Sequence, residues 1–277
     1  MAEAAASGGE TFWLLQAVLA EASWLEVLAP LVFLACWVGY WLMVDFFRID
    51  RRSLMRRMDE YRHAWMRQML VRDNRMVDVQ VVQVLVQNVS FFASSAILIV
   101  GGFVAVLGAS DQARAIAAEI PFAERSSPLV WDLKILLLIV VFVYAFFKFT
   151  WSLRQFNYVA ILIGAAPYDQ EPATLALAGQ IAVVAGRASD HFNRAMRAYY
   201  FGLAALSWFI QSWLFALCSV LVIIVIYRRE HRSAVLAVLG PAGQPVPGQP
   251  VPGQPVPGMT PEAPQEPARP LARGRGA

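Results

Sequence analysis

Four long apolar runs, separated by polar segments, set the hydrophobic pattern of this chain. They cover about residues 24–45, 79–107, 131–153 and 199–227. An α-helix rises 1.5 Å per residue, so about 20 residues cross a hydrocarbon slab roughly 30 Å thick. Each run reaches that length. The pattern predicts an all-α fold, a polytopic transmembrane bundle of about four spans over residues 24–235.

The last run is ambiguous, because Tyr199 to Tyr227 is longer than one upright crossing. A single tilted span would accommodate it. Gln211 and Ser212 near its middle also permit a broken helix or a re-entrant hairpin. The side of the membrane on which the chain ends depends on this choice.

The polar segment after the first run is rich in arginine, with nine between Arg48 and Arg75 and no lysine. Its apolar residues recur at helical spacing on one face: Leu54, Met58, Tyr61, Trp65 and Met69. This predicts an interfacial amphipathic helix. We expect it to meet anionic lipid headgroups through Arg51, Arg52, Arg56 and Arg57. A plain basic loop is the alternative, and nucleic acid is not an expected partner.

Both ends of the chain differ from the bundle. Residues 1–23 are predicted to be an N-terminal interfacial or periplasmic segment, since their apolar stretch is short and interrupted by Glu21. Residues 236–277 are rich in proline and glycine and contain QPVPG three times in succession. Such a segment buries too little apolar surface to fold, so a disordered tail is predicted.

Composition and charge placement support a membrane location. The chain is 58% hydrophobic and 16% charged, against about 45–50% and 25% in soluble domains. Basic residues concentrate in the segments 46–78 and 149–198. The positive-inside rule therefore predicts an external N-terminus and a multi-pass protein of the cell inner membrane. Four spans would, however, leave Arg228, Arg229 and Arg232 outside.

The second run carries a polar stripe at steps of three and four residues: Gln80, Gln83, Gln87, Ser90 and Ser94. In lipid, such groups would lack hydrogen-bond partners, so the stripe is predicted to face other helices or water. The sequence leaves the oligomeric state open, a homo-oligomer included.

The predicted cytoplasmic ends of the spans bring polar residues together, with acids on the first two elements and bases on the last two. These residues form a candidate ligand-binding network: Asp45, Asp78, Gln83, Gln87, Lys148, Arg154, Gln155, Asn157, Arg194 and Arg197. Such a network would stabilise the bundle or serve interaction. The alternative is a transporter-like protein, or one that binds an anion or a lipid headgroup.

Catalytic and metal-binding patterns are missing from the sequence. No HExxH, GxSxG or P-loop motif occurs. Cys36 and Cys218 both lie in apolar runs, and no cysteine–histidine cluster forms a metal-ligand set. We therefore expect neither enzymatic activity nor a cofactor.

Four blocks carry a family resemblance: FFKFTWSLRQFNY (146–158), HFNRAMRAYYF (191–201), RQMLVRDNRMVDVQ (67–80) and YRREHRS (227–233). They resemble the domain-of-unknown-function 599 family of multi-span membrane proteins over roughly residues 24–235. The resemblance implies a membrane location and a similar bundle. It implies no activity, since none is assigned to that family.

Overall fold

The computed structural model describes residues 24–43, 54–119, 121, 124, 126–232, 235, 238 and 239. They belong to the first of two units, Met1–Ala242. The predicted segment 1–23, the repeat tail of the second unit, and Asp45, Arg51 and Arg52 lie outside the described residues.

The described residues form seven α-helices and one 3-10 helix, without a strand. The elements are α2 (Trp24–Trp41), α3 (Leu54–Leu70), α4 (Met76–Gly108), α5 (Ser110–Ala118), α6 (Pro128–Ala165), α7 (Pro172–Ala205), η2 (Leu206–Phe209) and α8 (Ser212–His231). Four helices are long and apolar enough to cross a membrane: α2, α4, α6 and α8. The predicted all-α class with about four apolar spans is confirmed.

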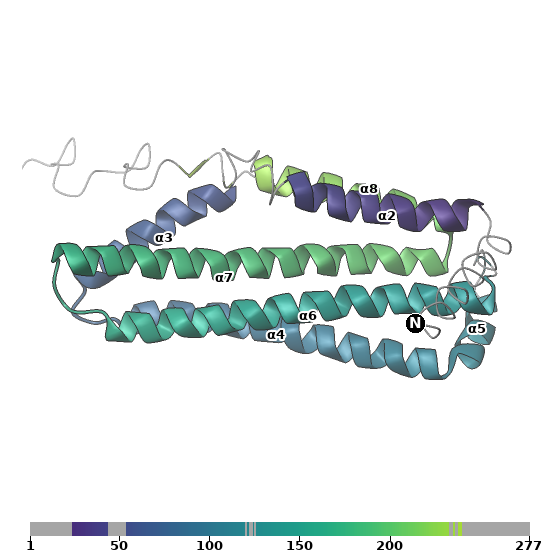
Figure 1. Ribbon diagram of the computed structural model, residues 1–277, viewed down its shortest axis with the longest axis horizontal. Coiled ribbons are helices and arrows are strands. Elements are labelled where there is room, and N and C mark those ends of the chain that lie inside the picture. The colour runs from purple at the N-terminus through teal and green to yellow at the C-terminus, as the bar shows by residue number, and fades with distance from the viewer. Residues whose placement is uncertain are drawn as a thin grey trace, which may run out of the picture. The chain divides into compact units, whose positions relative to one another are not determined.

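Helix α6 lies at the centre of the arrangement (Figure 1), with α4 and α7 packed along it. It starts where Ser127 accepts a hydrogen bond from the amide of Val130 and Pro128 occupies the first turn, as is common at helix starts. Helices α2 and α8 pack on each other, and α8 packs on α7, whereas α3 packs along α7.

The apolar run 199–227 is broken in the structure. Helix α7 ends at Ala205, η2 follows, and α8 begins at Ser212. Glu124 stabilises the new start, because its Oε2 accepts from the Ser212 amide at 3.1 Å and from its hydroxyl at 2.6 Å. The chain reverses between α7 and α8 (Figure 1), which excludes a single tilted span.

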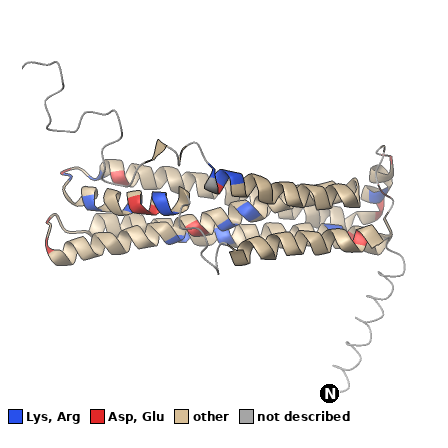
Figure 2. Cartoon of the chain, turned by 90° about the horizontal axis from the view of Figure 1, so that it is seen from above, with Lys and Arg blue, Asp and Glu red and all other residues tan. Residues whose placement is uncertain are grey.

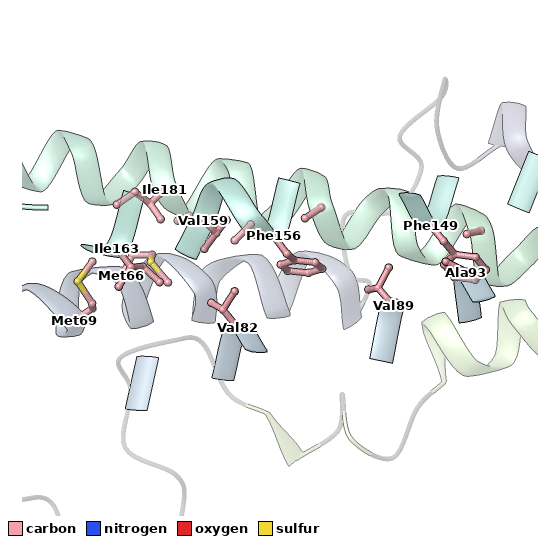
Figure 3. Packing of buried hydrophobic residues seen from close by; sticks show 14 of the residues in the cluster. Met66, Met69, Val82, Val89, Ala93, Phe149, Phe156, Val159, Ile163 and Ile181 are labelled. Carbon is pink, nitrogen blue, oxygen red and sulfur yellow. The ribbon is translucent and has the colours of Figure 1, made fainter. Parts of the chain in front are cut away.

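Two apolar cores follow one another along α6 and α7. One lies between α3, α4, α6 and α7, where Met66, Val82, Phe156 and Ile181 are buried (Figure 3). The other joins α2, α6, α7 and α8 through Phe33, Phe142, Phe201 and Phe215. Phe33 lies at the centre of the second core, with its ring 5.6 Å from Phe201 and 5.2 Å from Phe215.

Helix lengths differ between the two cores. Helices α2 and α8 have 18 and 20 residues, about 27 and 30 Å. Helices α4, α6 and α7 have 33, 38 and 34 residues, about 50 to 57 Å. The long helices therefore exceed a hydrocarbon slab by about 20 Å, over the half in which α3 covers them.

Candidate functional site

A hollow lies at the junction of the two cores, between α2, α6 and α7. We call it the aromatic hollow, and it is lined by Trp37, Tyr40, Trp41, Tyr144, Arg194, Arg197 and Phe201. Two of the predicted site residues, Arg194 and Arg197, thus line the same hollow. Four of the other five lining residues are aromatic rings with a polar edge.

Arg197 is held in place from two sides. Its Nε and Nη2 donate to Oε1 of Glu230 on α8, at 3.2 and 2.8 Å. Its guanidinium carbon lies 5.1 Å from the ring centroid of Tyr40, whose hydroxyl donates to Glu230 Oε2 at 2.6 Å. Three helices are thereby tied together at one point.

Lys148 adjoins the same hollow from α6. Its Nζ lies 5.4 Å from the ring centroid of Tyr144, one of the lining residues. A cation over an aromatic face is attracted by the ring quadrupole, more strongly where water is excluded. The hollow therefore combines the cations of Arg194 and Arg197 with aromatic rings, while Lys148 and the acid Glu230 contact its lining residues from outside. Such a set favours an anionic group over a cation.

The remaining predicted residues lie elsewhere. Asp78 is fully buried and accepts from Trp65 Nε1 at 2.6 Å and from Arg72 at 2.5 Å. Its Oδ2 has no hydrogen-bond partner within the described part of the chain. Its cationic partner thus comes from the turn between α3 and α4, not from α6 or α7.

Four more predicted residues line no part of the hollow. Gln83, Gln87 and Asn157 are exposed. Gln155 is half-buried, and its Oε1 has no hydrogen-bond partner among the described residues.

Arg154 is also exposed, and its Nε donates to the hydroxyl of Tyr158 at 2.6 Å. The structure brings Arg194 and Arg197 to one hollow, with Lys148 beside its lining residue Tyr144, and separates them from Asp78, because the long helices spread the polar residues along their axes. Ligand binding at any of these residues stays a prediction.

Sequence reasoning missed Glu230, the acid that holds Arg197. It follows the last apolar run within YRREH, where the surrounding arginines and histidine indicate only a basic end of the span. Tyr40, near the end of the first apolar run, also lacks a sequence signal for its contact with Glu230. The reversal between α7 and α8 brings Glu230 back to Arg197, and no local pattern predicts that contact.

A second polar cluster lies near the N-terminus of α6. Lys134 is almost completely buried, and its Nζ donates to Ser126 Oγ at 2.7 Å and to the Trp208 carbonyl at 3.1 Å. Ser126 in turn donates to Glu26 at 3.1 Å. The side chain of Lys134 thus points into the core that joins α2, α6, α7 and α8. Figure 2 shows few charged residues between the two polar regions.

Contacts along α3 differ from those expected of a helix lying on a leaflet. Met66, Met69 and Leu70 are buried in the bundle, while Arg56 is exposed and Arg57 pairs with Glu60. Burial lowers the pKa of Arg62, against the opposing effect of Asp59 and Asp190. Contact of Arg56 and Arg57 with lipid headgroups stays a prediction.

The connection between α6 and α7 is tied to the start of α4. Tyr168 donates to Asp73 at 2.5 Å, and this bond, with the charge of Asp73, raises the pKa of the phenol. Arg75 Nη1 donates to the Ile163 carbonyl at 3.1 Å and to that of Ala166, and Nη2 to that of Pro167 at 2.8 Å. These hydrogen bonds from Arg75 cap the C-terminus of α6.

No group of three histidine, cysteine, aspartate or glutamate residues in the described ranges is placed to hold a metal ion. Comparison with known proteins gives one family. A family model described as "Protein of unknown function, DUF599" matches residues 28–235. No curated protein and no solved structure matches the chain.

Proposed function

The chain belongs to the DUF599 family, and we propose that it is a non-enzymatic, multi-pass protein of the cell inner membrane that projects a helical bundle into the cytoplasm for interaction. The observation that carries this proposal is the length of α4, α6 and α7. They exceed the bilayer by about 20 Å, and a continuous apolar core supports the excess.

In this proposal the bilayer surrounds the core that joins α2, α6, α7 and α8. Helices α2 and α8 match its thickness and share the end at which α5 lies. Counting about 20 residues inward from that end puts the inner boundary near Gln87 on α4, Thr150 on α6 and Ser189 on α7. Lys148 then lies at this boundary, Arg194 lies five residues inside it, and the aromatic hollow lies in the inner part of the bilayer, next to the level where tryptophan and tyrosine concentrate.

The C-terminal half of α7 is then a fifth crossing beside the four apolar helices. It packs between α2, α6 and α8, with Ala195, Ala198, Phe201 and Gly202 buried. A helix surrounded by protein rather than lipid tolerates polar residues. Five crossings put the end of α8 in the cytoplasm, so Arg228, Arg229 and Arg232 agree with the positive-inside rule.

The interaction surface is the outside of the projecting half. Photo-crosslinking residues at exposed sites there, Ile161 on α6 and Val183 on α7, are expected to give protein adducts in cells. The same label at exposed sites of the membrane half, Val140 and Leu217, is expected to give lipid adducts. Lipid adducts from Ile161 and Val183 would overturn the proposal.

A second candidate function, binding of an anionic lipid headgroup, is favoured by the aromatic hollow. Lys148 brings positive charge to the headgroup level and Arg194 to just below it, and Trp41 supplies an amphipathic ring there. Phosphate groups accept several charge-assisted hydrogen bonds from guanidinium donors. The hollow is therefore suited to the phosphate of an inner-leaflet lipid.

Native mass spectrometry of the solubilised protein tests this second function. We expect anionic lipid to copurify with the unchanged protein and to be lost from Lys148→Met combined with Arg194→Gln. Arg67→Gln, at an exposed site on α3, removes a positive charge without touching the hollow and serves as the control. Equal lipid retention in both variants would argue against a headgroup site.

A further inference from the structure

The outer side of α4 carries a seven-residue repeat. One set of positions is apolar: Val77, Val84, Phe91 and Leu98. The set three residues later is polar or small: Gln80, Gln87, Ser94 and Gly101. All eight are exposed, and the four apolar side chains are 57%, 54%, 67% and 77% exposed. We call these eight residues the outer seam of α4.

The seam faces directly away from the protein's own core. Val82, Val89 and Ala96, also seven residues apart, are the buried side of α4, and Figure 3 shows Val82 and Val89 within the apolar cluster. If the apolar set of the seam is given the heptad position a and the polar set the position d, then Val82, Val89 and Ala96 are at position f, diametrically opposite the seam. Helix α4 packs against α6 on that side, and within the described residues no other helix covers the seam.

Neither lipid nor water suits the whole seam. Water suits Gln80 but leaves Val77 and Val84 exposed, lipid suits Phe91 and Leu98, and the amide of Gln87 lies at the boundary between the two. Apolar residues at a can pack against another helix with the same repeat, while polar residues in the seam specify its register at a cost in stability and small residues in the membrane part let two helices approach closely. We propose that the outer seam is a dimer interface, in which the α4 helices of two copies of this chain pair in parallel.

The chemistry of the seam favours a second copy over a different protein. No charged residue occurs between Asp78 and Asp111, so the seam meets itself without like-charge repulsion. A glutamine amide both donates and accepts hydrogen bonds, so Gln80 and Gln87 can each pair with the same residue of the other copy. The small residues Ser94 and Gly101 allow close approach of two helices within the membrane.

Membrane orientation sets the symmetry. Both copies insert in the same direction, so their α4 helices are parallel and each seam residue meets its own counterpart, as a twofold axis along the membrane normal requires. With the flanking e and g positions, the seam presents about 16 residues, somewhat fewer than the roughly 20 to 30 on one side of a standard protein interface. The inference goes beyond the proposed function and depends on it only for the common orientation.

Single cysteines test the pairing in native membranes, in a background in which Cys36 and Cys218 are alanine. Under mild oxidation, Gln80→Cys, Val84→Cys, Gln87→Cys and Ser94→Cys are expected to form disulfide-linked dimers. Gln180→Cys and Val140→Cys, at exposed sites on α7 and α6, are expected to stay monomeric. Equal cross-linking at all six sites would indicate random collision, and linkage to a protein of another mass would indicate a different partner; either result overturns the proposal.

A charge placed on the seam gives an independent test with a matched control. Gln87→Lys juxtaposes two like charges in the dimer and is expected to raise its dissociation constant more than about tenfold. Gln180→Lys makes the same chemical change on α7 and should leave the dimer intact. An unchanged dimer in Gln87→Lys, measured by native mass spectrometry, would contradict the proposed interface. A monomeric unchanged protein would refute self-association but leave the cytoplasmic projection standing.

Discussion

Arg197 and Glu230 form a largely buried charge pair that joins α7 to α8. Their side chains are 10% and 15% exposed, and each has a second partner in Tyr40. Removing one member of a buried pair leaves the other charge uncompensated, which typically costs more than removing both. The pair lies beside a hollow, so part of that cost is relieved by solvent.

We predict that Arg197→Met lowers the free energy of unfolding by about 3 kcal/mol, at the lower end for buried pairs. Adding Glu230→Gln to it should restore part of that loss. Thermal unfolding in detergent measures both variants, with Arg67→Met as an exposed control. A double variant less stable than Arg197→Met alone would show that the loss of stability in Arg197→Met does not come from the uncompensated charge of Glu230.

Alanine substitutions at two glycines of α7 are expected to change the stability of the protein in opposite directions. A Cβ at Gly202 would lie 2.8 Å from the ring of buried Phe142 and 3.3 Å from Val141, whereas a Cβ at Gly179 meets nothing within 4 Å. Gly202→Ala is therefore expected to cost about 1–3 kcal/mol through overpacking. Gly179→Ala should gain about 0.5–1 kcal/mol of helix stability. Equal shifts of the unfolding temperature would mean that α6 and α7 are not closely packed at Gly202.

At the scale of single elements, the sequence predicted the apolar helices well and the long polar helix poorly. The run around Trp131 to Tyr158 has a strong apolar signal and lies in α6. Only the part of α7 from Tyr199 onward belongs to a predicted apolar run, because Gly179, Gly186 and a cluster of charged residues interrupt the apolar pattern before it. Packing against α3 and α6 buries its alanines, and tertiary burial of this kind overrides local propensity.

Arg75 is expected to control the end of α6, although it lies just before α4. Its guanidinium donates to three carbonyls at the C-terminus of α6, which no backbone amide of that helix satisfies. Arg75→Ala should reduce stability by about 1.5–3 kcal/mol, the range for hydrogen bonds to a charged group. Lysine should restore little of this, because it lacks the planar fork.

Hydrogen exchange measures this effect locally. Amides near residues 163–168 should exchange faster in Arg75→Ala, while those around Phe142 stay protected. Arg67→Ala should change neither region. Uniform loss of protection along α6 would indicate global unfolding rather than loss of a cap.

At the scale of the molecule, the predicted cytoplasmic network was only partly recoverable from sequence. Hydropathy locates ends of apolar runs, so it brought Lys148, Arg194 and Arg197 to one level. It treated Asp78 and Asn157 as lying at that level too, because it does not indicate how far a helix continues beyond the membrane. The structure continues α4 and α6 well past that level, and these residues follow the helices.

The number of crossings gives the sharpest prediction for the whole molecule. Four crossings put the end of α8 outside, whereas five put it in the cytoplasm, because the C-terminal half of α7 adds one passage. A fluorescent protein that folds only in the cytoplasm, fused after Arg232, is therefore expected to fluoresce, and alkaline phosphatase fused there should be inactive. Alkaline phosphatase fused after Pro121, between α5 and α6, should be active, which shows that the reporter reads the outside. Active phosphatase after Arg232 would exclude the fifth crossing. It would also exclude the placement of the aromatic hollow at the inner leaflet, because α7 would then have to leave the bilayer at the level where Phe201 packs against Phe33.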